Sequence, residues 1–138
     1  MMYPPELVEP MRKELTTIGL RELRTAPEVE SYLTESAEPT LLVINSICGC
    51  SAGAARPAVK LALLNNKKPA RMATVFAGQD SDATAKAREL IVGYPPSSPM
   101  IVLFKDRKPV FAIERKDIER RIAPEIASDL VDAFNTYL

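Results

Sequence analysis

The stretch LLVINSICGC, residues 41–50, decides the expected fold, because an apolar strand leads directly into two closely spaced cysteines. Residues 41–44 form a continuous apolar run bounded by turn signals, which is typical of a strand buried on both faces. The alanine-rich segment that follows Cys50 predicts a helix. Open α/β sheets carry their reactive groups at such strand–helix junctions. The stretch therefore predicts a site at the carboxyl end of a sheet.

Further helices and strands are expected on both sides of this stretch. Thr25, Pro27 and Glu28 form a capping box that starts a helix. The expected helices cover residues 11–19, 25–35, 52–64 with a kink or restart at Pro57, 81–92 with Asp80 or Ser81 as N-cap, and 124–138. The expected strands cover residues 41–44, 72–77, 100–104 and 109–113, with residues 21–24 a short strand or a connector.

This order of elements predicts an α/β fold. Strand–helix–strand units indicate a parallel core, and the last two strands are expected to add an antiparallel hairpin at the sheet edge. The result is a mixed central β-sheet with helices on both faces. The length of 138 residues fits one domain, and we expect a single domain over residues 1–138.

Composition excludes several classes of function. Lys plus Arg and Asp plus Glu number 18 each and are scattered, so we expect no nucleic-acid partner. No apolar run is long enough to span a membrane, and the first residues lack a signal-peptide pattern, so the expected location is cytoplasmic. Histidine is absent, which excludes catalytic triads and His-ligated metals. We expect neither a metal nor a cofactor.

The two cysteines of the chain, Cys48 and Cys50, are the candidate catalytic residues. The start of the next helix offers partial positive charge and free N–H groups, which stabilise a thiolate, the nucleophile in disulfide exchange. Cys48 lies at the turn, nearer solvent, and is expected to be the more exposed and more acidic nucleophile. Cys50 is drawn under the first helical turn and is expected to resolve. Gly49 gives this short turn its backbone freedom.

Three other interpretations of the pair stay open. The thiols could be two ordinary buried cysteines, although their spacing at a strand–helix junction argues against coincidence. They could bind zinc, but a site of four ligands would then have to be shared between subunits. They could also form an incidental redox-active pair on an unrelated binding module. Arg56, Asp80 and Glu114 are further charged candidates near this end of the sheet, and Arg56 is the one suited to favour a thiolate or an anionic thiol.

Several separate blocks of the chain match one known family in order. They are residues 45–53 (NSICGCSAG), 55–58 (ARPA), 74–80 (TVFAGQD), 83–85 (ATA), 93–99 (GYPPSSP) and, more loosely, 8–15. On these blocks the chain resembles the bacilliredoxins, a thioredoxin-like family with a Cys-Gly-Cys active site. The chain departs from the family at residues 116–121, KDIERR, where members carry HEIEGH, and at Tyr137-Leu138, where members carry a cysteine nearby.

The resemblance implies a thioredoxin-like three-layer sandwich and a function. Cys48 would attack mixed disulfides on S-thiolated client proteins and accept a low-molecular-weight thiol, bacillithiol or a similar one, and Cys50 would resolve that adduct. Thioredoxin-like proteins carry a cis proline before the corresponding hairpin strand, so Ser98–Pro99 is expected to be cis and to pack against the cysteines. Gly49, Ser98 and Pro99 are the expected substrate-binding residues. A protein disulfide isomerase and a non-catalytic redox-sensing adaptor are the alternatives.

Overall fold

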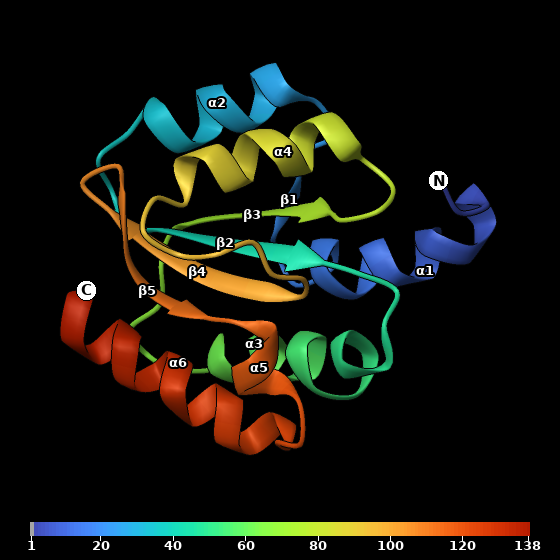
Figure 1. Cartoon of the computed structure of the whole chain (residues 1–138). Coiled ribbons are helices and arrows are strands. Elements are labelled where there is room, and N and C mark those ends of the chain that lie inside the picture. Colours follow the sequence, from blue (N-terminus) through green and yellow to red (C-terminus); the bar gives the residue numbers. More distant parts are fainter. Residues whose placement is uncertain (1) are drawn as a thin grey trace.

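The computed structural model describes residues 2–138, in which five strands form one sheet with helices on both faces (Figure 1). The strands are β1 (Arg21–Glu22), β2 (Thr40–Asn45), β3 (Arg71–Phe76), β4 (Met100–Lys105) and β5 (Lys108–Ile113). The helices are α1 (Pro5–Thr16), α2 (Ala26–Thr34), the π-helical η1 (Ser51–Ala55), α3 (Arg56–Ala62), α4 (Ser81–Leu90), α5 (Arg115–Ile118) and α6 (Ala123–Tyr137). Within residues 2–138, no helix combines the length and apolarity needed to cross a membrane.

The strand order is β1-β3-β2-β4-β5, which makes the sheet mixed, as predicted. β3 runs parallel to both β1 and β2, whereas β4 runs antiparallel to β2 and to β5. The prediction that both hairpin strands lie at the edge is wrong for β4. β4 pairs with the side of β2 that β3 leaves open, so only β5 of the hairpin forms an edge.

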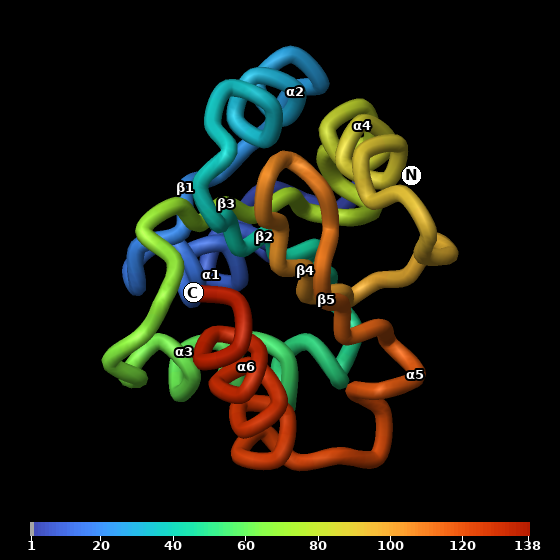
Figure 2. The backbone as a smooth tube through the Cα atoms, turned by 90° about the vertical axis from the view of Figure 1, so that its left-hand side faces the viewer, coloured from blue at the N-terminus to red at the C-terminus, as the bar shows by residue number. Residues whose placement is uncertain are grey.

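The sheet separates two apolar clusters, because successive side chains of a strand point to opposite faces. Leu41 and Val43 of β2 pack into one cluster with α1, α3 and α6. Leu42 and Ile44 pack into the other cluster with α2 and α4. Figure 2 shows α2 and α4 together on one side of the sheet and α3 and α6 on the other. The predicted three-layer arrangement is confirmed.

The first helix begins earlier than expected. The sequence predicts residues 11–19, but α1 covers Pro5–Thr16 with Pro10 inside it. Proline suits the first helical positions, because the N–H it lacks would have no partner there. Pro10 does remove an interior hydrogen bond, and the buried side chains of Val8 and Leu15 hold the helix across that position.

The helix after the cysteines is continuous but changes its hydrogen-bond pattern. Residues 51–55 form a π-helical turn, and α3 then starts at Arg56 with Pro57 in its first turn. This is the restart predicted at Pro57. The capping box at Thr25 and Glu28 is also confirmed, with the Glu28 N–H donating to Thr25 Oγ1 over 3.3 Å. The short helix α5, which follows β5, was not predicted.

Candidate active site

Cys48 and Cys50 lie in the loop between the end of β2 and the start of η1. They therefore sit beyond the carboxyl end of a central strand and not beside a sheet edge. Both are free thiols and both are partly buried, so the structure does not show the expected difference in exposure. Their surroundings differ instead. Cys48 lines a surface pocket of about 330 Å³, whereas Cys50 packs against the apolar cluster that includes α3 and α6.

The surroundings of Cys48 favour its thiolate. Burial by itself raises the pKa of Cys48, but hydrogen bonds from the Cys50 thiol, the Ser46 hydroxyl and the backbone N–H groups of Ser51 and Cys50 outweigh it. The net effect lowers the pKa of Cys48 to about 7. Because the thiolate is the reactive form, this thiol is prepared for nucleophilic attack near neutral pH.

Cys50 shows the opposite shift. Burial, the hydrogen bond to Cys48 and the negative charge of the Cys48 thiolate together raise the pKa of Cys50 to about 11, against a smaller lowering by Arg115. Near neutral pH a large part of Cys48 is therefore ionised while Cys50 keeps its proton. This order of acidity agrees with the sequence prediction.

Buried hydroxyl groups support the loop from below. The Ser46 and Ser51 hydroxyl oxygens lie 2.7 Å apart and share a hydrogen bond. Ser46 Oγ also accepts a hydrogen bond from the Cys48 N–H over 3.4 Å. The Ser51 N–H donates to the Cys48 carbonyl oxygen over 3.0 Å. These contacts fix the backbone on both sides of Cys48.

Arg56 is buried beneath the same loop and does not point to a thiolate. Its Nη1 donates to Asn45 Oδ1 over 2.8 Å and to the Ser46 carbonyl oxygen over 2.9 Å. Its Nε lies 3.1 Å from Glu14 Oε1, an ion pair without hydrogen-bond geometry. Arg56 thus positions the end of β2, which differs from the thiolate-stabilising role that the sequence suggested for it.

The sheet register brings the Ser98–Pro99 loop to the cysteines. The Ser98–Pro99 peptide bond is cis, as predicted. Ile44 pairs with Met100 in the antiparallel register of β2 and β4, which places Ser98 opposite Ser46 just beyond the sheet. Ser98 lines the pocket with Cys48, while Pro99 is buried. Contact of Pro99 itself with the cysteine turn stays a prediction. Gly49 is exposed, with open space beside its Cα.

The pocket is also lined by two arginines, Arg88 and Arg115, which the sequence did not single out as candidates. Arg115, the first residue of α5, donates from Nη1 to the Ser98 carbonyl oxygen over 3.4 Å, and its positive charge acts on both thiols. Arg88 of α4 lines the pocket too, and its Nε is buried without a hydrogen-bond partner within residues 2–138. The hairpin register, in which Ile101 pairs with Ile113, could have placed Arg115 next to Pro99.

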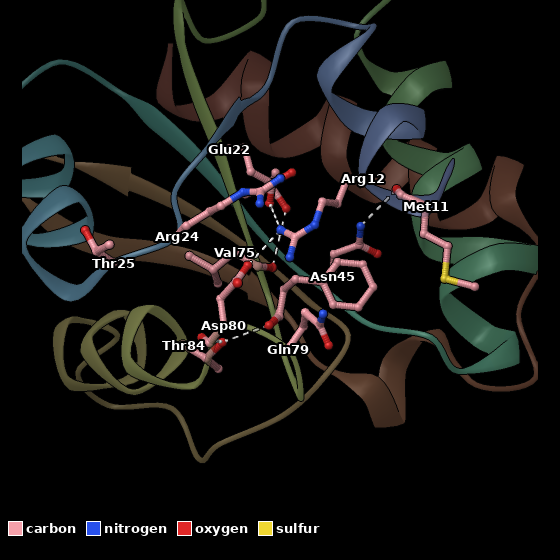
Figure 3. A network of polar contacts seen from close by, with 12 residues as sticks. Met11, Arg12, Glu22, Arg24, Thr25, Asn45, Val75, Gln79, Asp80 and Thr84 are labelled. Atoms are coloured by element: carbon pink, nitrogen blue, oxygen red, sulfur yellow. Dashed lines mark hydrogen bonds and ion pairs between the residues drawn. The ribbon is translucent and has the colours of Figure 1, made fainter. Parts of the chain in front are cut away.

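The other two charged candidates serve neighbouring structure. Asp80 accepts a hydrogen bond from Arg12 Nη1 over 2.7 Å, and Arg12 also pairs with Glu22 over 2.8 Å (Figure 3). Glu114 precedes α5, where its N–H donates to Asp117 Oδ2 over 3.1 Å, and it lines an adjoining groove. The pocket around Cys48 instead contains Tyr3 and Ile47, with Ala77 and Gly78 of the turn after β3.

Comparisons with known proteins give a consistent result. A family described as disulphide isomerase matches residues 3–138. A bacilliredoxin of Salinibacter ruber is 55% identical over 99% of this chain and 82% of its own length. A bacilliredoxin of Geobacillus kaustophilus is 48% identical over 98% of this chain and 94% of its own length. Among solved structures, Fasciola hepatica thioredoxin aligns with a TM-score of 0.59 at 22% identity, over 86% of this chain and all of its own length, a likeness of fold.

Proposed function

The chain belongs to the bacilliredoxin family of thioredoxin-fold thiol–disulfide oxidoreductases, and on this premise we propose that it removes a low-molecular-weight thiol from mixed disulfides on client proteins. The observation that carries the proposal is a thiol with its pKa lowered to about 7 that opens on a pocket of about 330 Å³. A pocket of this volume matches the lower end of small-molecule sites. Bacillithiol or a similar thiol is the proposed occupant.

The first step is a thiol–disulfide exchange at Cys48. The Cys48 thiolate attacks the small-thiol sulfur of the mixed disulfide, so that a new bond joins Cys48 to the small thiol. The original disulfide bond breaks, and the client cysteine leaves as a thiolate that takes a proton from water. Arg88 and Arg115 are the positive charges beside this reaction, and they suit a small thiol that carries carboxylates.

The second step uses Cys50, and the first step prepares it. The hydrogen bond and the negative charge of Cys48 contribute to the raised pKa of Cys50, and both are lost when Cys48 becomes part of a disulfide. Cys50 then gives up its proton more easily, attacks the Cys48 sulfur and releases the small thiol as a thiolate. The Cys48–Cys50 disulfide that forms has lost two electrons, which a thiol reductant returns through two further exchanges.

The remaining site residues have roles in client binding. We propose that the backbone at Gly49 and Ser98 faces an extended client segment and that Pro99 shapes this surface. Disulfide isomerase activity is the second candidate, favoured by the description of the matching family. A cytoplasmic location is part of the same proposal, because a reducing compartment keeps such a pair available for exchange.

The experiment is single-turnover and steady-state reduction of a client protein that carries bacillithiol on one cysteine. The wild-type protein is expected to turn over with added thiol reductant. Cys50→Ser is expected to remove one equivalent and retain the small thiol on Cys48, as seen by its mass. Cys48→Ser should be inactive. Slow stoichiometric oxidation of the wild type without turnover would contradict the proposal and favour the redox-sensing adaptor.

A further inference from the structure

Tyr3 forms a wall of the Cys48 pocket, although it lies at the start of the described chain. Its ring lies against the turn after β3. A Cβ atom added to Gly78 would come within 3.1 Å of Tyr3 Cε2 and 3.6 Å of its hydroxyl oxygen. Ala77 and Gly78 themselves offer only a methyl group and a bare Cα to the pocket. The Tyr3 ring is therefore the large side chain on this side of the pocket.

A single amide side chain holds the backbone of Tyr3 in place. The Tyr3 N–H donates to Gln79 Oε1 over 2.7 Å, and Gln79 Nε2 donates to the Tyr3 carbonyl oxygen over 3.0 Å. Both backbone polar groups of Tyr3 are thus satisfied by one residue of the β3–α4 turn. α1 begins two residues later, at Pro5, so little free chain separates the ring from a helix.

The helix that carries this segment is fixed in turn by a buried charge network. Arg12 of α1 is 4% exposed and pairs with Glu22 and with Asp80, the residue next to Gln79 (Figure 3). Its guanidinium also lies 5.2 Å from the centre of the Phe76 ring. The turn between β3 and α4 therefore binds Tyr3 through Gln79 and also binds α1 through Asp80. The wall is ordered before a substrate arrives, which reduces the entropy cost of binding.

We propose that Tyr3 is a specificity-determining residue, whose ring contacts the part of the small thiol that lies beyond its sulfur. The inference rests on the proposed function and names the residue that selects among small thiols. An aromatic ring supplies a large contact area with few rotatable bonds. The enzyme then prefers adducts of thiols large enough to reach the ring over adducts of very short thiols. The exchange steps themselves are unchanged.

The test compares two adducts of one client protein, with bacillithiol and with 2-mercaptoethanol. The measured quantity is the kcat/KM for the bacillithiol adduct divided by the kcat/KM for the 2-mercaptoethanol adduct. Tyr3→Ala is expected to lower this ratio about tenfold, mainly through a higher KM for the bacillithiol adduct. Tyr3→Phe, which keeps the ring, should restore the ratio to within about twofold of the wild type. The matched control is Tyr137→Ala, which removes the same side chain from a different pocket.

The outcomes separate this inference from the proposed function. A ratio unchanged in Tyr3→Ala, or lowered equally in Tyr137→Ala, would overturn the role of Tyr3. A wild type that turns over neither adduct would overturn the proposed function instead. The contact is then measured at equilibrium in Cys50→Ser protein, by exchange of bacillithiol and 2-mercaptoethanol on Cys48. Tyr3→Ala should shift that equilibrium about tenfold towards 2-mercaptoethanol, and the absence of a shift would refute the contact.

Discussion

Ser46 and Ser51 share a buried hydrogen bond of 2.7 Å between their hydroxyl oxygens, directly beneath the loop that carries both cysteines. A hydroxyl group carries a single hydrogen, and Ser46 uses its own to stabilise the Cys48 thiolate. Ser51 is therefore the donor in the serine pair when Cys48 is ionised. The acidity of Cys48 thus depends on a short chain of hydroxyl groups as well as on its immediate neighbours.

Replacing Ser46 by alanine is expected to raise the pKa of Cys48. One hydrogen bond to a charged group contributes about 1.5 kcal/mol, which corresponds to about one pH unit. The rate of iodoacetamide labelling of Cys48 against pH, read by peptide mapping, measures the shift. Ser51→Ala should give a smaller rise, because Ser51 acts through Ser46 and its backbone N–H remains. An unchanged midpoint in Ser46→Ala would contradict the hydroxyl chain.

The two cysteines should react in a fixed order. Labelling of Cys48 is expected to have its midpoint near pH 7 and to be lost as pH falls below this value, because protonation removes the thiolate. Cys50, with its pKa raised to about 11 while Cys48 is a thiolate, should be labelled only after Cys48 at neutral pH. Cys50→Ala should shift the Cys48 midpoint upward, since the thiol that donates to Cys48 is gone. Earlier labelling of Cys50 at neutral pH would reverse the assigned roles.

Arg56→Met is expected to destabilise the fold by about 2–3 kcal/mol. The change removes two hydrogen bonds from a charged donor and leaves the buried oxygens of Asn45 and Ser46 without them. Urea denaturation measures the loss of unfolding free energy. Arg56→Lys keeps the charge but not the forked geometry, and it should recover part of that loss. A Met variant as stable as the wild type would show that Arg56 does not hold the loop.

Arg12→Met should be the more costly change, about 3–5 kcal/mol near neutral pH. It leaves the partly buried carboxylates of Glu22 and Asp80 together without their cation, and Glu22 Oε1 already lacks a hydrogen-bond partner within residues 2–138. Thermal or urea unfolding at pH 7 provides the measurement. A loss below about 1 kcal/mol, the range of an exposed ion pair, would contradict the importance of this network.

The same variant should show a characteristic dependence on pH. Burial raises the pKa of Glu22, against the lowering effect of Arg12. A carboxyl group with a raised pKa adds stability at pH values below its ordinary pKa, and this contribution is lost as pH rises through the raised value. The cost of Arg12→Met should therefore be smaller in acid, where Glu22 is neutral. A cost that does not change with pH would exclude Glu22 as its source.

Much of the site followed from local sequence, because its signals act over a few residues. The apolar run at residues 41–44 predicted the central strand, and the Cys-Gly-Cys turn after it lies where a buried strand meets a helix. The cis bond before Pro99 was also expected, from a family resemblance. The sequence did not predict that α1 begins at Pro5, because Pro10 then lies inside the helix. A proline at such a position is tolerated only where packing of the whole helix compensates for the lost hydrogen bond.

By itself, the sequence determined the mixed α/β fold, the candidate thiol pair and the greater acidity expected of Cys48, all of which depend on neighbours along the chain. Only the tertiary structure decided what surrounds that thiol. Tyr3, Arg88 and Arg115 line one pocket but come from three distant segments of the chain. Gln79 holds Tyr3 by hydrogen bonds, α4 carries Arg88, and the register of the β4–β5 hairpin places Arg115. Such a pocket depends on long-range pairing and packing, which no local pattern of residues encodes.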